Sequence, residues 1–597
     1  AGPPSDIFSL GCVLYEMVAG RRAFVRETPA QTMTAILEQS PAPLPQSRKP
    51  VPPDLERVIA QCLNKYPGSR MQSARDVAVA LRDIARGAAI APAAAPRSRP
   101  GMKAVVGAAL SVLVVASLAG IYYRDHSGAT SSIAILPFVN ASGNPDMEYL
   151  GDGIAESLIN SLSQAPNLAV MSRNAVFRYK GREFDAQEVG QKLNVEAVLA
   201  GRVVQRGDTL SISAELIDVR SNRQVWGGRF NRRTADILAV QEEISTEISE
   251  HLRLQLTGDQ KLRLARRYTQ NVEAYQLYLR GRYYWNKKTP DGFNKGIEYF
   301  QKAIELDPNF APAYAGIAAC YTNLANYNFA LIPPREAWAK AKAAASRAVE
   351  IDDTLAAGHA SLALVSYQWE WDWPNAEKEF QRAIGLDPAS ASTFEPNPAS
   401  TYHWYSHFLM TMRRTQESFR TGRQALSLDP LDLAISAHQG WYYLWTREYD
   451  RAVEPLKQAI ELDPTFPVSQ WYLGLVYEQK GMHREAIDKF QNCVRLTGGR
   501  PSMLALLGHA YAVAGRKTEM QATLDQLRAL TGQRYVPSYS VATIYAALGR
   551  SDEAFTWLER ACDEHDSWMV YVGLDPRLDP LRSDPRFAAL LKRIGLS

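Results

Sequence analysis

The sequence has few cysteines and little net charge, and each shortage excludes a class of protein. Five cysteines in 597 residues are too few for a disulfide-rich scaffold, and none of them forms a Cys-x-x-Cys pair. No group of cysteines and histidines has the spacing of zinc ligands, so the sequence predicts no metal site. The formal net charge is only +4 and the basic residues are scattered, so we expect no nucleic-acid partner.

The length and the composition predict a multidomain globular protein, with 46% hydrophobic and 22% charged residues. Residues 1–86 have a mixed, helical pattern, and residues 87–103 form an Ala/Pro-rich linker. Residues 132–256 alternate strand and helix patterns, whereas residues 270–597 are helical almost throughout. The expected fold class is therefore mainly α, with one small α/β domain.

Residues 104–123 form an uncharged, apolar stretch. A helix of this length, at a rise of about 1.5 Å per residue, spans about 30 Å, the thickness of the hydrocarbon core of a bilayer. Tyr122 and Tyr123 stand where an interfacial aromatic belt would lie. We therefore expect one transmembrane helix; the alternative is a buried helix of a globular domain.

The charges that flank this stretch predict its orientation. Arg97, Arg99 and Lys103 precede it, and the cytoplasmic flanks of membrane spans carry an excess of lysine and arginine. We expect a single-pass protein with residues 1–103 in the cytoplasm and residues 124–597 in the extracytoplasmic space.

The tripeptide Leu-Asp-Pro recurs in the second half of the chain, and its last two prolines, Pro430 and Pro464, lie 34 residues apart. This is the period of the tetratricopeptide repeat, a pair of antiparallel helices. Gly474, Ala486 and Phe490 stand at the spacing of that family, and residues 270–597 resemble about eight such repeats with a C-terminal cap. One hairpin cannot bury its apolar face alone, so we expect the repeats to stack into an α-solenoid.

The resemblance implies a groove along the solenoid that binds partner proteins or peptides. The residues that map to this groove are His403, His407, Trp441, Trp471, Glu478, His509 and Tyr539. Aromatic side chains would anchor an extended peptide, since Trp and Tyr contribute strongly at interfaces. The alternative is that each residue serves packing or lies on an ordinary surface. His403 and His407 lie four apart on one predicted helix, but no nearby Cys or Glu completes a metal site.

Two segments near the N-terminus resemble the C-terminal lobe of protein kinases. The run from Ser5 to Phe24 is similar to the start of its large central helix, and the run from Cys62 to Leu81 is similar to its last helices. The resemblance implies roles for three residues. Asp6 would bond the backbone of the catalytic loop, Gly11 would permit close helix packing, and Arg70 would pair with a glutamate at the end of the activation segment.

The motifs that transfer phosphate are absent from this sequence. Transfer needs a glycine-rich loop, a lysine on the phosphates, a catalytic aspartate and a metal-binding aspartate, and none of these motifs occurs. We expect residues 1–86 to be an all-α partial kinase lobe without catalytic residues or a cofactor. ATP and Mg²⁺ would belong to a full-length parent. Because the first residue is Ala1 rather than methionine, we favour a truncated receptor-like kinase over a natural non-enzymatic protein.

Residues 132–256 resemble the TolB-like N-terminal domain, which implies no catalytic residues. The matching segments are Ile135–Phe138, Gly151–Glu156, Val198–Val203 and Gln224–Phe230. Acidic residues, among them Asp152 and Glu156, gather near the start of the first helix of this region. Two carboxylates could act as acid and base, but acids at a helix N-terminus are also stabilised by the helix dipole, and we expect them to be solvated.

Three functions follow from these resemblances. The first is the C-terminal part of a bacterial Ser/Thr protein kinase of the inner (cytoplasmic) membrane, whose TolB-like and tetratricopeptide region binds partner proteins. The second is a non-enzymatic membrane-anchored scaffold or sensor. The third is an adenylate-cyclase-like or transcriptional sensor that shares the outer regions, and the kinase-like segment argues against it.

Overall fold

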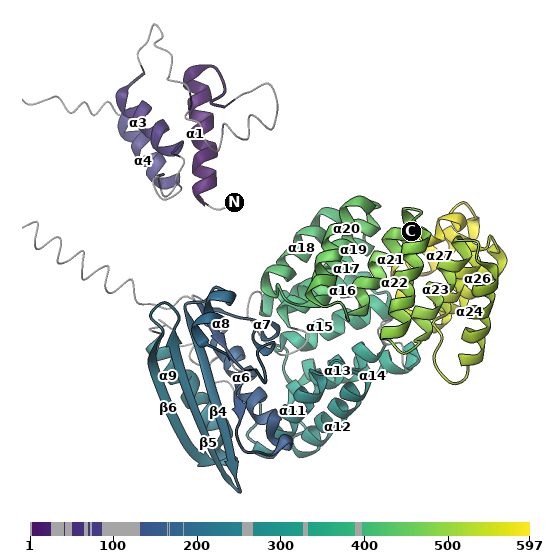
Figure 1. Ribbon diagram of the computed structural model, residues 1–597, viewed down its shortest axis with the longest axis horizontal. Helices are drawn as coiled ribbons and strands as arrows, with labels where there is room; N and C mark the ends of the chain where they lie inside the picture. Colours follow the sequence, from purple (N-terminus) through teal and green to yellow (C-terminus); the bar gives the residue numbers. More distant parts are fainter. Residues whose placement is uncertain are drawn as a thin grey trace, which may run out of the picture. The chain divides into compact units, whose positions relative to one another are not determined.

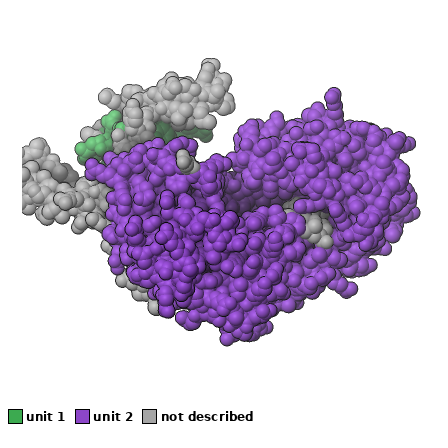
Figure 2. Space-filling view, turned by 60° about the horizontal axis from the view of Figure 1, so that its bottom comes forward, with its two compact units in different colours: residues 1–119 green, residues 120–597 purple. Residues whose placement is uncertain are grey.

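The structure, a computed structural model, describes residues 3–24, 41, 51–64, 70–71, 74–85, 132–163, 165, 168–182, 184–252, 267–325, 332–387 and 397–596. The chain forms two compact units, Ala1–Ala119 and Gly120–Ser597, which Figure 1 draws as ribbons and Figure 2 colours separately. The expected transmembrane stretch at 104–123 lies outside the described residues. Of the helices that are described, none combines the length and the apolar character needed to cross a bilayer.

The first unit contains a small helical core. Its described helices are α1 (Pro3–Ala19), α3 (Pro53–Cys62) and α4 (Ala74–Ala85). A Cβ on Gly11 of α1 would lie 2.7 Å from the Cβ of Cys62 on α3, so glycine allows these two helices to approach closely. Ile7, Val58 and Val77 are buried around this contact and join the three helices.

The second unit begins with a mixed sheet. Its strands are β1 (Ser132–Ile135), β2 (Val139–Asn140), β3 (Ala169–Val170), β4 (Ala197–Arg206), β5 (Thr209–Asp218) and β6 (Arg223–Arg233). The strand order is β3-β1-β4-β5-β6, and β2 also pairs with β4. Strand β1 is parallel to β3 and β4, whereas β4, β5 and β6 form an antiparallel meander. Alternation along β5 places Leu210, Ile212 and Leu216 on one buried face.

Short and long helices complete this sheet domain. They are η2 (Pro145–Met147), α6 (Glu148–Leu162), α7 (Arg173–Phe177), α8 (Ala186–Leu193), η3 (Thr234–Asp236) and α9 (Ile237–His251). Helices α6 and α9 contact each other, and their apolar residues, such as Leu158 and Ile244, are buried in the core shared with the sheet.

Eight antiparallel helix pairs follow among the residues described between 267 and 564, the number of repeats expected from the sequence. The pairs are α11 (Val272–Trp285) with α12 (Pro290–Leu306), α13 (Ala311–Ala325) with α14 (Pro334–Ile351), α15 (Ala356–Val365) with α16 (Trp373–Leu386), α17 (Pro398–Thr411) with α18 (Thr415–Leu428), α19 (Leu433–Trp445) with α20 (Tyr449–Leu462), α21 (Pro467–Gln479) with α22 (His483–Leu496), α23 (Pro501–Val513) with α24 (Lys517–Leu530), and α25 (Ser538–Ala547) with α26 (Ser551–Glu564). A π-helical turn, η4 (Ser366–Glu370), follows α15. The pairs stack in sequence order, from teal to yellow in Figure 1.

The repeated Leu-Asp-Pro segments end the second helices of these pairs. In α12, α18 and α20 the leucine is the last helical residue, and the N–H of the following aspartate bonds to an alanine carbonyl four residues earlier. These alanines, Ala303, Ala425 and Ala459, are buried. The proline then prevents another helical turn, since it has no N–H and clashes with the preceding turn.

The turns inside the pairs show the same period. Gly481, Gly515 and Gly549 lie 34 residues apart and have φ angles of 73°, 70° and 69°. Arg447 and Arg413 occupy the equivalent positions one and two repeats earlier, with φ angles of 64° and 59°. A residue with a Cβ is strained in this left-handed region, so the two arginines adopt a turn that glycine forms more easily.

Gly474 shows why small residues recur in the pattern. A Cβ on Gly474 would lie 2.6 Å from the ring of Phe490, so α21 and α22 can approach only because that atom is absent. Gly281 stands in the same relation to Phe300 in the first pair, with a distance of 2.5 Å. In each of these two pairs, the close approach of the helices therefore depends on the glycine of the first helix.

Candidate functional site

The seven residues predicted to line an open groove are all buried. They lie on α17, α19, α21, α23 and α25, which are the first helices of their pairs, as the repeat pattern predicts. None of the seven is more than 5% exposed, and Trp441, Trp471 and Tyr539 are 0% exposed. Their burial contradicts the expectation of an accessible groove at His403, His407, Trp441, Trp471, Glu478, His509 and Tyr539.

The physical reason for four of them is that the end of the chain covers His407, Trp441, Trp471 and Tyr539. The C-terminal segment, residues 565–596, contains η5 (Ser567–Tyr571), η6 (Pro576–Leu581) and α27 (Pro585–Arg593). The ring centroid of Trp568 lies 5.0 Å from that of Trp471, and the centroid of Tyr571 lies 5.5 Å from that of Trp441. Burial of large aromatic surfaces is favourable, so the chain itself satisfies the apolar side chains that a peptide would otherwise cover.

Polar contacts hold the C-terminal segment to several helix pairs. The indole N–H of Trp338 on α14 donates to the Ser567 hydroxyl at 3.3 Å, and that of Trp373 on α16 donates to the Ile594 carbonyl at 3.1 Å. Arg447, in the turn between α19 and α20, forms an ion pair with Asp579 at 2.6 Å. The segment therefore contacts repeats that are more than 100 residues away in sequence.

Glu478 and His509 form a buried pair between α21 and α23. The His509 Nδ1 lies 3.0 Å from a Glu478 carboxylate oxygen, and the two side chains are 3% and 2% exposed. A buried carboxylate is stable only with such a partner. This contact accounts for both residues through packing between neighbouring repeats.

The structure brings His403 and His407 together with a third histidine, His438 of α19. The three ring centroids lie 4.4 to 4.7 Å apart, and one ring nitrogen of each lies within 4.8 Å of the others. Burial lowers the pKa of His403 to about 3, and it holds the pKa of His407 and His438 well below the ordinary value. All three rings are therefore neutral at physiological pH. His438 was missed in the sequence, although it lies 35 residues after His403, close to the 34-residue period that places neighbouring first helices side by side.

The sheet domain is attached to the repeats by a buried carboxylate. Glu156 of α6 accepts hydrogen bonds from Arg173 at 2.5 Å, Arg282 at 3.2 Å and Asn286 at 2.7 Å. A second contact joins Asp429, at the end of α18, to Ser172 and Asn174, at 2.9 and 2.8 Å. The sheet domain therefore contacts α11 and, more than 140 residues later, the end of α18.

Two of the acidic residues expected to be solvated are buried instead. Asp152 and Glu156 are each 4% exposed. Asp152 accepts a hydrogen bond from Lys180 at 2.7 Å, and burial raises its pKa although the lysine charge opposes this effect. The prediction of solvated acids is wrong for these two residues, because basic side chains from α11 and from the α7 region cover the helix.

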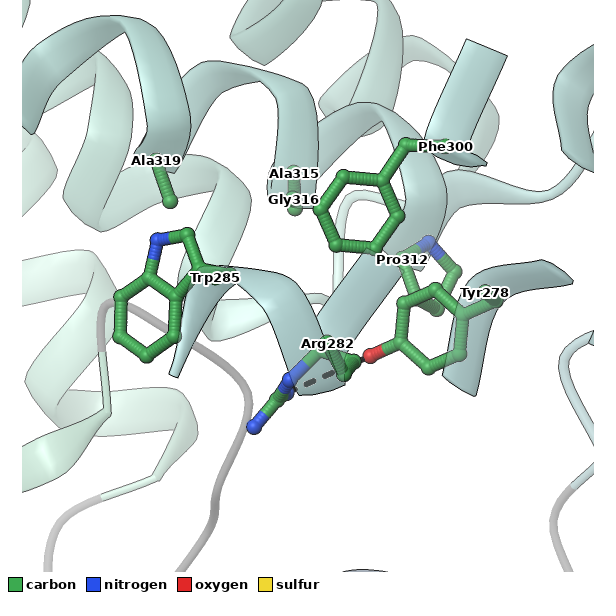
Figure 3. A pocket seen from close by; sticks show the side chains of 8 residues that line it. All are labelled: Tyr278, Arg282, Trp285, Phe300, Pro312, Ala315, Gly316 and Ala319. Atoms are coloured by element: carbon green, nitrogen blue, oxygen red, sulfur yellow. Dashed lines mark hydrogen bonds between the residues drawn. The ribbon is translucent and has the colours of Figure 1, made fainter. Parts of the chain in front are cut away.

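Figure 3 shows a pocket beside this interface. Its lining residues are Tyr278, Arg282, Trp285, Phe300, Pro312, Ala315, Gly316 and Ala319. The guanidinium of Arg282 donates to the Tyr278 hydroxyl at 3.4 Å and to Glu156 at 3.2 Å. Burial raises the pKa of Tyr278, so its hydroxyl stays neutral. Arg282 therefore joins the sheet domain to the first repeat through its ion pair with Glu156. The remaining lining residues of the pocket are mostly apolar.

The kinase-like residues of the first unit make local contacts. The guanidinium of Arg70 lies 4.7 Å from the ring centroid of Phe8, and its Nε donates to the Asn64 carbonyl at 2.7 Å. Asp6 lies in α1, but its side chain is outside the described structure. Pairing of Arg70 with a glutamate and bonding of Asp6 to a catalytic loop stay predictions.

Comparison with protein families supports the assignment of tetratricopeptide repeats. For the sheet domain it gives a different family from the TolB-like one expected from the sequence. Two models of the tetratricopeptide repeat match residues 277–310 and 448–481, which confirms that part of the expected fold. A model of the second domain of HilA/YgeH-like transcriptional regulators matches residues 129–247. The resemblance of this region to the TolB-like domain therefore stays a prediction.

Curated relatives match only parts of the chain. A putative adenylate cyclase 3 of Rhizobium meliloti is 33% identical over 237 residues, which is 40% of this chain and 40% of the cyclase. The Ser/Thr kinase PknB of Mycolicibacterium smegmatis is 33% identical over 85 residues, 14% of each chain. PknD of Mycobacterium tuberculosis is 38% identical over 81 residues, 13% of this chain and 12% of the kinase. The chain thus spans two fifths or less of the length of these relatives.

Solved structures with similar repeats resemble the chain weakly. The Cut9–Hcn1 complex of the APC/C is 17% identical, covers 60% of this chain and 63% of its own, and has a TM-score of 0.37. YrrB, described as a TPR protein with an unusual peptide-binding site, is 17% identical, covers 36% of this chain and 98% of its own, and has a TM-score of 0.24. With scores this low, neither comparison bears on function.

Proposed function

We propose that this chain is the C-terminal part of a membrane-bound bacterial Ser/Thr protein kinase whose sheet domain and tetratricopeptide repeats bind a partner protein. The observation that carries the proposal is the presence, in one chain, of a kinase-like helical unit and a tetratricopeptide array. The close packing of α1 on α3 at Gly11 and the partial matches to bacterial kinases support the kinase assignment. This chain lacks the phosphate-transferring motifs, so activity belongs to the longer parent protein.

In this proposal residues 104–123 cross the inner membrane, with residues 1–103 in the cytoplasm and residues 124–597 outside it. The supporting observations are the uncharged length of the stretch and the basic residues before it. Binding of a partner to the outer repeats would change the association of the membrane spans and so bring kinase domains together.

A partner peptide would compete with the C-terminal segment for the covered residues. The segment places Trp568 and Tyr571 against Trp441 and Trp471, so it already occupies the aromatic surface that the repeats would offer. A partner with aromatic anchors would displace Trp568 and Tyr571 and expose Trp441 and Trp471 to the ligand.

Two steps test the kinase proposal. The genomic sequence upstream of this region is expected to encode, in frame, a glycine-rich loop and a catalytic aspartate. The full-length protein, reconstituted in lipid vesicles, is then expected to autophosphorylate, and deletion of residues 132–597 is expected to change how autophosphorylation depends on a partner. A variant with the catalytic aspartate replaced by asparagine serves as the inactive control. An upstream stop codon with a start site near Ala1 would contradict the kinase and favour a non-enzymatic scaffold.

The match to the cyclase favours a second candidate, a sensor region used with different enzymatic outputs. The match is 237 residues long, so about half of it or more falls in residues 120–597. In this alternative the sheet domain and the repeats form an input module whose enzymatic output in the whole protein is a cyclase. An intact upstream cyclase domain in place of a kinase would support it.

A further inference from the structure

Three histidines from two neighbouring repeats meet inside the second unit. His403 and His407 lie one turn apart on α17, and His438 faces them from α19. Their residues are 5%, 2% and 5% exposed. One ring nitrogen of each lies within 4.8 Å of the others, so the three rings converge on one point in the core.

Two nitrogens of this group have no hydrogen-bond partner among the described residues. They are Nε2 of His403 and Nε2 of His407, and both are inaccessible to solvent. Buried polar atoms nearly always have a partner, because an unsatisfied one costs the free energy of its lost hydration. Two such nitrogens in one cluster are therefore available to bind a ligand.

Both ring nitrogens of His438 and Nδ1 of His407 have partners that orient the rings. The Nδ1 of His438 lies 2.5 Å from the Ala434 carbonyl oxygen, which can only accept, so this nitrogen carries the proton. Its Nε2 then holds a lone pair and accepts from the Tyr472 hydroxyl at 3.0 Å. The Nδ1 of His407 contacts the Tyr571 hydroxyl at 2.7 Å. Metal-bound histidines are typically held by such contacts of the second nitrogen.

We propose that His403, His407 and His438 bind one divalent transition-metal ion, of which zinc fits best. Neutral imidazoles are good ligands for zinc, cobalt and copper, whereas magnesium and calcium prefer oxygen ligands, and no carboxylate belongs to this cluster. Two nitrogens bound to one zinc lie about 3.3 Å apart, so nitrogens that are now up to 4.8 Å apart must move closer by up to about 1.5 Å. The Tyr472 hydroxyl releases Nε2 of His438 when the ion binds, and a water molecule takes the fourth position.

The ion links two repeats and stabilises the packing of the C-terminal segment on them. It joins α17 to α19 directly, and the contact of His407 with Tyr571 connects it to the C-terminal segment. The ring of His407 also stacks on Trp441 with centroids 4.0 Å apart. Metal binding therefore favours the conformation in which the C-terminal segment covers the aromatic residues.

The test uses the purified full chain without an affinity tag, stripped with a chelator and titrated with cobalt(II) or zinc chloride. Metal is added both to the folded chain and during refolding from urea, so that slow entry into the core does not hide binding. One equivalent of cobalt with the visible absorption of a four-coordinate nitrogen site is expected, and zinc is expected to displace it. A wild-type chain that retains no stoichiometric metal by either route overturns the proposal.

Variants locate the site. His403→Gln and His438→Gln are each expected to weaken zinc binding by about 100-fold or more, since even loss of a supporting contact costs 10- to 100-fold. His509→Gln is the matched control, because His509 is also buried but pairs with Glu478 outside the cluster. Circular dichroism without metal shows whether each variant folds. Zinc binding that is unchanged in both cluster variants, or lost equally in the control, overturns the assignment.

Discussion

The Tyr539 hydroxyl donates a hydrogen bond of 2.8 Å to the Asp575 carboxylate, and this contact joins the last helix pair to the C-terminal segment. Arg577 completes the arrangement with an ion pair of 2.6 Å to Asp575, and both side chains of that pair are 1% exposed. Burial alone would raise the pKa of Asp575, but the charge and hydrogen bonds of Arg577 hold it below its usual value. The ion pair lies within the segment and fixes the Asp575 carboxylate that accepts from Tyr539, and its two charges cannot separate without leaving one of them buried.

Replacing Arg577 with methionine leaves the Asp575 carboxylate buried without its cation. The expected loss is about 3–5 kcal/mol in the free energy of unfolding, the usual cost of removing one partner of a buried pair. Urea denaturation followed by tryptophan fluorescence measures it. Arg347→Met is the control, because the pair of Arg347 with Glu350 is exposed, and no measurable change is expected. Equal effects of the two substitutions would contradict this account of the segment.

Gly474→Ala tests the close approach of α21 and α22. The added methyl group would lie 2.6 Å from the Phe490 ring, so we expect the free energy of unfolding to fall by about 1–3 kcal/mol, typical of overpacking. Gly385→Ala in α16 is the control, since no atom lies within 4 Å of its added Cβ. There alanine should stabilise the helix by about 0.5–1 kcal/mol. A neutral Gly474→Ala variant would show that the pair tolerates a wider separation.

Arg413→Gly tests the strain in the turn between α17 and α18. Arg413 has a φ of 59° at the position where later repeats have glycine, so glycine should relieve a strain of about 1–2 kcal/mol. A rise in the melting temperature of the repeats would confirm the strain. The reciprocal change, Gly515→Ala at a φ of 70°, should lower it. Opposite shifts would show that the left-handed turn does not limit stability.

Asp566 gives the stability of this region a pH dependence of known sign. Its carboxylate is buried and accepts hydrogen bonds from the backbone N–H groups of Trp568 and Tyr539, at 3.0 and 3.1 Å. Burial raises its pKa from 3.8 to about 6. The folded state therefore binds a proton more readily than the unfolded state, and this stabilisation is present below pH 4 and is lost as the pH rises through 6.

The Asp566→Asn variant isolates this effect, because asparagine does not titrate. Between pH 4 and pH 7 the free energy of unfolding of the wild type should fall relative to the variant by on the order of 2 kcal/mol, since one pKa unit corresponds to about 1.4 kcal/mol. Chemical denaturation of both proteins at several pH values measures the difference. If the difference in the free energy of unfolding between the two proteins stays constant from pH 4 to pH 7, or changes in favour of the wild type, the raised pKa is contradicted.

The 34-residue period accounts for most of what the sequence predicts correctly. Small residues such as Gly474 and the Leu-Asp-Pro ends of the second helices are local signals, so they predict the helix pairs and their stacking. The path of the C-terminal segment is not periodic, and nothing near Trp441 or Trp471 in sequence indicates that Tyr571 and Trp568 cover them. The groove was therefore expected to be open.

The histidine cluster could be predicted from the sequence only in part. His403 and His407 form an i, i+4 pair that the sequence shows directly, whereas His438 belongs to the next first helix. Its distance of 35 residues from His403 is one residue more than the period, so a search along the repeat would have found it. The buried contact of Glu156 with Arg282 is different, because 126 residues separate the two and no pattern connects them.

Residues 565–581 cover His407, Trp441 and Trp471 on α17, α19 and α21. Hydrogen–deuterium exchange of the full chain, read out by mass spectrometry, tests it most directly. If the claim is right, the amides of η5 and η6 exchange as slowly as those of α19 and α21, and Arg577→Met speeds exchange in both sets. Rapid exchange of residues 567–581 in the wild type, with slow exchange in the repeats, would contradict it.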